Sequence, residues 1–208
     1  MRVDDLLERW HALTGDEVSG QELLTRWSEP HRRYHDVDHL RSVLHTVDQL
    51  AGDAVDPDAV RLAAWFHDAV YTGRPGDDER TSAELAATML PALGVEAEKV
   101  AEVVRLVELT ATHEPAAADR NGAVLCDADL AVLGADPDAY ATYAAAVREE
   151  YQDVPDEEFR AGRSAVLERF ASRDPLFHTT TARNRWEQTA RRNIDTELSL
   201  LRGGASAS

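Results

Sequence analysis

Apolar residues recur at intervals of three and four positions along most of the chain, the spacing that places them on one face of an α-helix. Gly15, Pro30 and Gly52 interrupt this pattern early in the chain, and Asp136 followed by Pro137 indicates the start of a later helix. The predicted helices cover about residues 6–15, 19–29, 36–50, 60–71, 79–93, 100–107, 120–133, 137–151, 155–171 and 182–201. Because no segment shows the alternation typical of a strand, the pattern predicts an all-α fold.

The segment from Val60 to Tyr71 is apolar around almost its whole circumference, which predicts a helix buried at the centre of a bundle. No repeat or linker divides the chain. We therefore expect one helical domain over residues 1–202, followed by a disordered tail over 203–208. In the last helix, Glu187 and Arg191 have the spacing of a helix salt bridge, and we expect them and Asn193 to have structural roles.

Composition and charge narrow the choice of partners. The 208 residues carry a net charge of -17, which argues against binding to DNA, RNA or an anionic membrane. An anionic substrate would therefore need a local positive site. No apolar run is long enough to span a membrane and no signal-peptide core is present, so we expect a cytoplasmic protein. The single cysteine, Cys126, excludes an intramolecular disulfide and is expected to be a small buried residue.

Two histidines fall at positions where burial is expected. His39 continues the apolar stripe of Val43 and Val47, and His67-Asp68 closes the most apolar helix. An ionised aspartate buried there is unfavourable unless it is paired or binds a metal ion.

The His-Asp doublet occurs twice, and only its surroundings distinguish the two copies. His35-Asp36 lies beside arginines at a predicted helix start, where an exposed cap is expected. His67-Asp68 lies in an apolar run, where an unpaired charge is hard to accommodate. We therefore expect the second doublet to carry the chemistry.

A further carboxylate comes from the stretch Asp127-Ala128-Asp129. Helical geometry aligns Asp129 with Leu125 and Val132, which points it inward, whereas Asp127 lies nearer the opposite face. Asp129 is the preferred ligand. Asp127 remains either a partner of the ligands or an exposed residue.

Two imidazoles and two carboxylates, from His39, His67, Asp68 and Asp129, suit one divalent ion such as Mn, Fe, Co, Ni, Zn or Mg. Such a site leaves positions for water and for a phosphate oxygen. The alternative is structural: an inward histidine is often a hydrogen-bonded core residue, and an inward aspartate is often a cap or a salt-bridge partner.

The order of these residues resembles the H…HD…D signature of the HD-domain superfamily, and the wider pattern is similar to a bacterial subgroup of predicted metal-dependent HD phosphohydrolases. The resemblance covers about residues 26–201. Its further motifs are Glu29–His35, Trp65–Tyr71, Asp78–Ala83, Thr110–His113 and Trp186–Asn193.

This resemblance implies a single-domain helical bundle of the HD type with one divalent ion bound by His39, His67, Asp68 and Asp129. The implied activity is hydrolysis of a phosphate ester or phosphoanhydride in a nucleotide or another small phosphorylated metabolite, through a metal-activated water. Monomer and homodimer both remain open, as do the metal and the substrate.

Other residues are candidates for roles around the ion. Asp68 or Glu79 would take a proton from the attacking water, although Glu79 also fits a simple position in the first turn of a helix. Arg32 and Arg33 are candidates for phosphate binding, or for pairing with nearby acids. His35 and His113 would line the substrate pocket, and Tyr34 and Tyr71 would supply hydroxyl groups or pack.

Two other functions are alternatives to an enzyme. One is a non-catalytic sensor that binds a metal and a nucleotide, and the other is a purely structural helical protein. The intact set of ligands favours the enzyme.

Overall fold

The computed structural model describes residues 3–203, which form ten α-helices and two 3-10 helices, with no strand among them. The predicted all-α class is therefore confirmed, while an HD-type arrangement stays a prediction. The chain divides into two compact units, Met1–Ala128 and Asp129–Ser208. The single domain expected over residues 1–202 also stays a prediction. The last helix extends to Gly203, and the rest of the expected tail, 204–208, lies outside the described residues.

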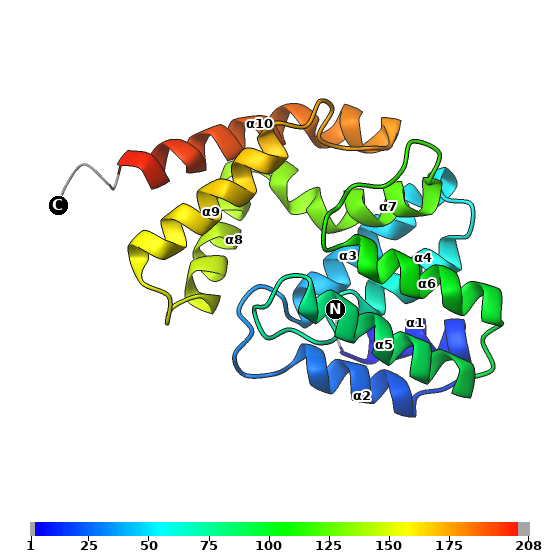
Figure 1. Ribbon diagram of the computed structural model, residues 1–208. Coiled ribbons are helices and arrows are strands. Elements are labelled where there is room, and N and C mark those ends of the chain that lie inside the picture. Colours follow the sequence, from blue (N-terminus) through cyan, green and yellow to red (C-terminus); the bar gives the residue numbers. More distant parts are fainter. Residues whose placement is uncertain (1–2, 204–208) are drawn as a thin grey trace. The chain divides into compact units, whose positions relative to one another are not determined.

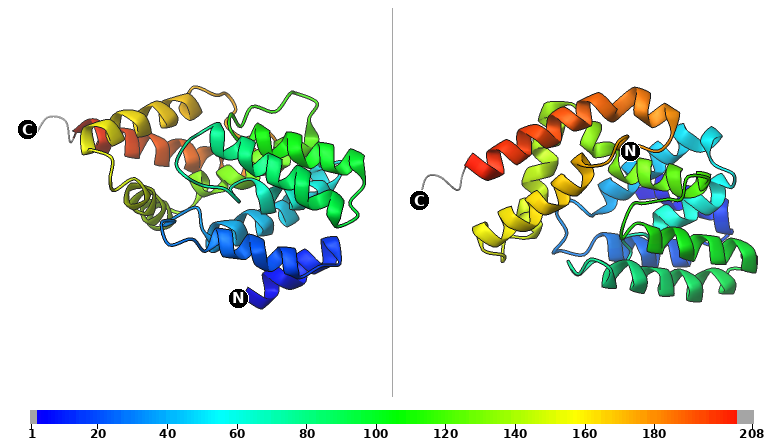
Figure 2. Two further views of the ribbon diagram at one scale, coloured as in Figure 1. Left: turned by 60° about the horizontal axis from the view of Figure 1, so that its bottom comes forward. Right: turned by 45° about the horizontal axis from the view of Figure 1, so that its top comes forward.

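The first unit is helical throughout its described length. Its elements are α1 (Val3–Thr14), α2 (Val18–Trp27), α3 (Val37–Leu50), η1 (Ala51–Asp53), α4 (Pro57–Phe66), α5 (Asp77–Ala92), α6 (Ala97–Leu109) and α7 (Arg120–Asp129). Helix α4 packs against both α3 and α6, and α5 lies alongside α6 (Figures 1 and 2). Trp65 on α4 contacts the edge of Trp10 from α1, with ring centroids 5.1 Å apart. Because α4 packs against α3 and α6 and most of its residues are buried, it is the central helix that the sequence predicted.

Helix α4 ends at Phe66, whereas the sequence pattern predicted a helix to Tyr71. The backbone beyond it makes different bonds. The carbonyl oxygens of Asp68 and Ala69 accept hydrogen bonds from Arg32, and the N–H of Val70 donates to Ser82 Oγ. Because side chains from other segments bind these groups, residues 67–70 turn away from the helix axis.

Short polar side chains bind the first N–H groups of α2 and α3. Asp36 caps α3 by accepting hydrogen bonds from the N–H groups of Asp38 and His39. Helix α2 begins at Val18, one residue before the predicted start at residue 19. Asp16 accepts hydrogen bonds from both the N–H and the hydroxyl of Ser19 in its first turn.

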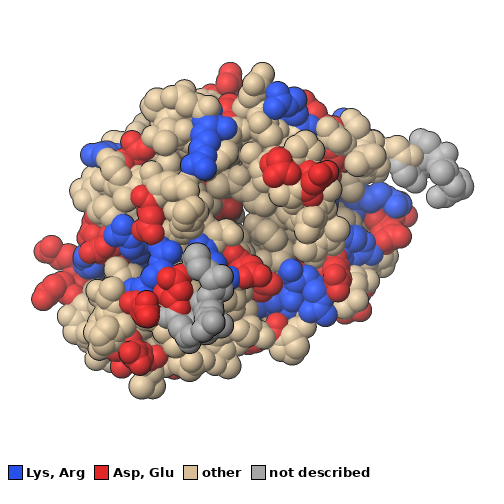
Figure 3. All heavy atoms as spheres, turned by 180° about the vertical axis from the view of Figure 1, so that it is seen from behind, with Lys and Arg blue, Asp and Glu red and all other residues tan. Residues whose placement is uncertain are grey.

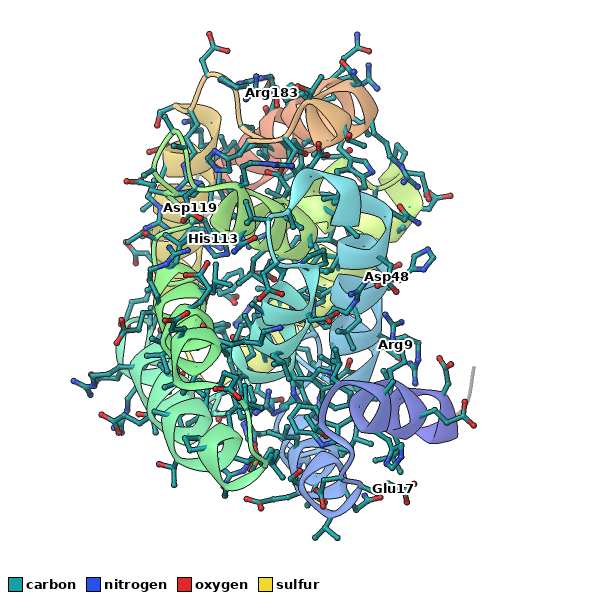
Figure 4. The ribbon with its side chains drawn as sticks, turned by 90° about the vertical axis from the view of Figure 1, so that its right-hand side faces the viewer. Arg9, Glu17, Asp48, His113, Asp119 and Arg183 are labelled. Carbon is teal, nitrogen blue, oxygen red and sulfur yellow. The ribbon has the colours of Figure 1, made fainter. Side chains whose placement is uncertain are left out.

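Charged side chains join helices that are distant in sequence. Arg9 on α1 reaches toward Asp48 on α3 and lies 2.5 Å from its carboxylate (Figure 4). Arg61 on α4 pairs with the other oxygen of Asp48 at 2.8 Å. One carboxylate thus connects α1, α3 and α4.

The second unit contains the remaining elements, which are η2 (Leu130–Gly134), α8 (Pro137–Glu150), α9 (Asp156–Ala171) and α10 (Thr180–Gly203). Helix α10 packs against η2 and α9. Arg163 on α9 forms a two-pronged pair with Glu197 on α10, at 2.8 and 3.1 Å. Tyr140 donates to the same carboxylate, and burial together with this bond raises the pKa of Tyr140. These bonds pair the buried polar groups of Tyr140, Arg163 and Glu197 with one another.

The structural roles expected for Glu187, Arg191 and Asn193 are confirmed. Glu187 accepts from the N–H groups of Leu176 and Phe177 and pairs with Arg191 at 2.7 Å. Asn193 donates from Nδ2 to two carbonyl oxygens at the end of η2, at 2.9 Å each.

Acidic and basic side chains alternate over the face of the molecule in Figure 3, so on that face the net charge of -17 is not gathered into one acidic area. None of the helices within residues 3–203 combines the length and the apolarity needed to cross a bilayer.

Candidate metal centre

Two imidazole rings meet inside the first unit. His39 lies in the first turn of α3 and His67 directly follows α4, and both are buried. Their Nε2 atoms are 3.2 Å apart. With metal–nitrogen distances of about 2.1 Å, two imidazole nitrogens bound to one ion at roughly right-angled to tetrahedral geometry lie about 3.0–3.4 Å apart. The observed separation therefore fits a shared ion.

The other nitrogen of His67 fixes the state of its ring. Nδ1 lies 2.9 Å from the carbonyl oxygen of Ala64, which can only accept, so Nδ1 carries the proton. In the neutral ring, Nε2 then presents a lone pair toward His39. Metal-binding histidines commonly have this arrangement, because the bond to a carbonyl orients the ring.

Two carboxylates border the imidazoles. His39, His67 and Asp129 form a group whose ligand atoms all lie within 4.8 Å of one another and which could hold a metal ion. Asp129 is the last residue of α7, whose preceding residues belong to the first unit, and that helix carries it. Asp68 borders the group, with Oδ2 3.2 Å from His67 Nε2 and 3.8 Å from His39 Nε2.

Asp127 is only 1% exposed, so the alternative of an exposed residue at this position is wrong. The helical-face argument failed because Val124–Ala128 are all buried and α7 has little exposed face near its end. Cys126 is buried, as expected. Asp129 is less buried than Asp127, yet its carboxylate is the one that lies within 4.8 Å of the ring nitrogens of His39 and His67.

The ring of Trp27 packs against both candidate ligands, a role that the sequence did not indicate. Its centroid is 5.4 Å from that of His67 and 6.2 Å from that of His39, and its Nε1 donates to the carbonyl of Trp65. Trp27 only looked like one more apolar position of an amphipathic helix. Its contacts depend on residues that lie far along the chain.

Two roles were considered for Arg32, binding substrate phosphate or pairing with a nearby acid, and its contacts in the structure are those of the second. Its side chain is fully buried, and its guanidinium donates to the Glu29 carboxylate and to the carbonyls of His35, Asp68 and Ala69. A guanidinium has five N–H groups, and these bonds use all five. None is left for a phosphate oxygen.

Glu79 has the alternative position considered for it, in the first turn of a helix. Its Oε2 accepts a hydrogen bond from the N–H of Gly76 at 2.5 Å, which caps the start of α5. The loop before α5 is ordered by Asp78, a buried residue that the sequence did not single out. Asp78 accepts from the N–H and hydroxyl of Thr72 and from the N–H of Arg74.

The remaining predicted substrate residues differ in their surroundings. His35 is half-buried, stacks on Tyr71 at 4.4 Å between centroids, and lies 5.6 Å from the ring of His39. Arg33 is exposed and donates to the carbonyls of Pro30 and Arg32. His113 has a left-handed backbone, with φ of 54°, at the end of α6 (Figure 4). Substrate binding by His35, Arg33 and His113 stays a prediction.

No protein-family model, curated protein or solved structure matches the chain. The resemblance to the HD-domain superfamily therefore rests on the sequence motifs alone.

Proposed function

We propose that the protein is a metal-dependent phosphohydrolase of the HD type that acts on a small phosphorylated substrate such as a nucleotide. The observation that carries the proposal is the pair of facing Nε2 atoms of His39 and His67, with the Asp129 carboxylate beside them. This mixed nitrogen and oxygen set suits a divalent ion. The order of the same residues in the sequence supports the HD type.

A bound divalent ion would polarise a phosphoryl oxygen and lower the pKa of a coordinated water. His39 and His67 are buried, so their imidazoles border the site on the side away from solvent. Asp68 is the better of the two candidate bases. Its Oδ2 is 3.2 Å from His67 Nε2, and its side chain is 16% exposed, so it borders both the group and solvent. Glu79 has its carboxylate engaged at the start of α5.

Half-exposed rings support a substrate with an aromatic base. The rings of Tyr34 and His35 lie 4.8 and 5.6 Å from the ring of His39, Tyr71 stacks on His35, and all three side chains are partly exposed. Flat rings of this kind stack on bases without requiring a particular base. They favour a nucleotide among the small phosphorylated molecules.

The test begins with the protein purified without added metal. Its metal content is measured by elemental analysis, and hydrolysis is screened over nucleotides and sugar phosphates with Mn, Co, Ni and Mg. His67→Ala is compared with His45→Ala, which replaces an exposed histidine on α3. We expect about one ion per chain and turnover in the wild type and in His45→Ala, and the loss of both in His67→Ala.

Equal metal content in His67→Ala and wild type, or no metal in the wild type even after addition, would overturn the metal centre. A bound metal without turnover across the whole panel would instead indicate the sensor function.

A further inference from the structure

Arg32 is a buried cation next to the candidate metal centre. It lies in the segment between α2 and α3, and its side chain has no solvent exposure. Its guanidinium carbon lies 5.3 Å from the ring centroid of Trp27 and 5.5 Å from that of Tyr71. A guanidinium keeps its charge in such surroundings, so its N–H groups require acceptors.

The acceptors join two separate segments. Nη1 donates to the carbonyl oxygens of His35 and Asp68, both at 2.8 Å. Nη2 donates to the carbonyl of Ala69 at 3.3 Å, and Nε and Nη2 both reach Glu29 Oε2. One planar group thus connects the segment that leads into α3 with the turn that follows α4.

These two segments carry the candidate ligands. The carbonyl of His35 directly precedes Asp36, the cap of α3, and His39 lies one turn further along. The carbonyls of Asp68 and Ala69 directly follow His67. The bond to the carbonyl of Asp68 holds the backbone that carries its side chain, whose Oδ2 lies 3.2 Å from His67 Nε2 and 3.8 Å from His39 Nε2.

We infer that Arg32 is a positioning residue for the metal centre, which holds the backbone of His35 and Asp68 so that His39 and His67 keep their facing geometry before an ion binds. The inference rests on the proposed metal centre. A lysine offers three donors on a flexible stem and cannot span the same five acceptor contacts. Groups that orient metal ligands typically contribute about 10–100-fold to metal affinity.

The experiment compares Arg32→Lys with Arg191→Lys. Arg191 serves as the control because it also binds one glutamate together with backbone carbonyls, two of them (Ala171 and Arg173) where Arg32 binds three. Each protein is measured for its Tm, for its Co²⁺ affinity by calorimetry, and for the visible absorption of bound Co²⁺, which reports coordination geometry. We expect both variants to lower Tm, and only Arg32→Lys to weaken Co²⁺ binding by about tenfold or more and to change the spectrum.

If Arg32→Lys folds and binds Co²⁺ with the affinity and spectrum of the wild type, the positioning role of Arg32 is overturned. The proposed metal centre is then unaffected. If Arg32→Lys shows no cooperative unfolding, Glu29→Gln decides, because Glu29 is partly exposed and binds two of the five N–H groups. For Glu29→Gln, a loss of Co²⁺ affinity smaller than the tenfold expected for Arg32→Lys supports the inference, and an unchanged affinity overturns it. If the wild type does not bind Co²⁺, both the metal centre and the role of Arg32 are overturned. If it binds Co²⁺ but hydrolyses no substrate, only the proposed enzymatic activity is overturned.

Discussion

The Nδ1–H of His67 donates to the carbonyl oxygen of Ala64, one turn earlier in the chain. This bond joins the ring to the last turn of α4, and the opposite ring nitrogen, Nε2, lies toward His39. The candidate metal centre is therefore organised in part by the backbone of α4, a largely buried helix.

Metal binding is expected to raise the thermal stability of the protein. At a metal concentration of about 100 times Kd, the free energy of unfolding rises by about 2.7 kcal/mol, which is a Tm increase of roughly 5–10 °C for a chain of this size. His39→Gln should abolish this increase, because it removes one of the two facing nitrogens. His45→Gln on the same helix should keep it. Thermal scans with and without Mn²⁺ give the answer, and an equal increase in all three proteins would mean that the ion binds elsewhere.

The two aspartates at the end of α7 should separate into different phenotypes. Asp129→Asn is expected to lower metal affinity while changing the Tm of the metal-free protein little, because Asp129 is only half-buried. Asp127→Asn alters a carboxylate that is 1% exposed and should lower Tm instead. Parallel calorimetry and thermal scans test this. The reverse pattern would make Asp127 the ligand.

Asp68 and Glu79 are distinguished by kinetics on whichever substrate the screen identifies. Asp68→Asn should lower kcat by about 10²–10⁴-fold if Asp68 takes the proton of the attacking water. Glu79→Gln should leave kcat within about twofold, since its side chain binds the N–H of Gly76 and an amide oxygen can still accept that bond. A larger loss in Glu79→Gln than in Asp68→Asn would restore Glu79 as the base.

Stability should depend on the ionised form of Glu187. Burial raises the pKa of this carboxyl, but hydrogen bonds from the N–H groups of Leu176 and Phe177 and from Arg191 outweigh burial. The pKa therefore lies below its ordinary value of 4.5. A lowered pKa means that the contribution is complete above the ordinary value and is lost as the pH falls through the folded value. Glu187→Gln should cost about 2 kcal/mol at pH 7, and the gap in stability from wild type should narrow as the pH is lowered to about 3. A constant gap across this range would contradict the assignment.

Asn193 provides a test of the second unit that is independent of metal. Asn193→Ala removes both hydrogen bonds to the carbonyls of Leu133 and Ala135 and should cost about 2–3 kcal/mol. Asn184→Ala, at an exposed position of the same helix, should be neutral or slightly stabilising. Urea unfolding measures the stability of both variants. A similar loss of stability in the two would show that the effect comes from helix propensity and not from the hydrogen bonds of Asn193.

Local rules predicted most helices well, because their signals lie within a few residues of each helix end. Asp36 before α3, and Asp136 with Pro137 before α8, are caps that the sequence displays directly. The end of α4 was predicted several residues late. It depends on Arg32 and Ser82, whose bonds to residues 68–70 come from distant parts of the chain.

The same distinction holds for the candidate site. The burial of His39 and His67 was predictable from their apolar neighbours. The role of Arg32 was not, because a sequence shows that an arginine is present but not which acceptors bind its five N–H groups. The burial of Asp127 was missed since it depends on what covers α7 on each side.

The packing of Trp27 against both imidazoles gives the protein an internal optical probe. An indole ring 5.4 Å from His67 and 6.2 Å from His39 is within range of efficient quenching by a paramagnetic ion bound to them. Because the ring of Trp27 contacts both histidines, its emission would report occupancy of the centre without any added dye.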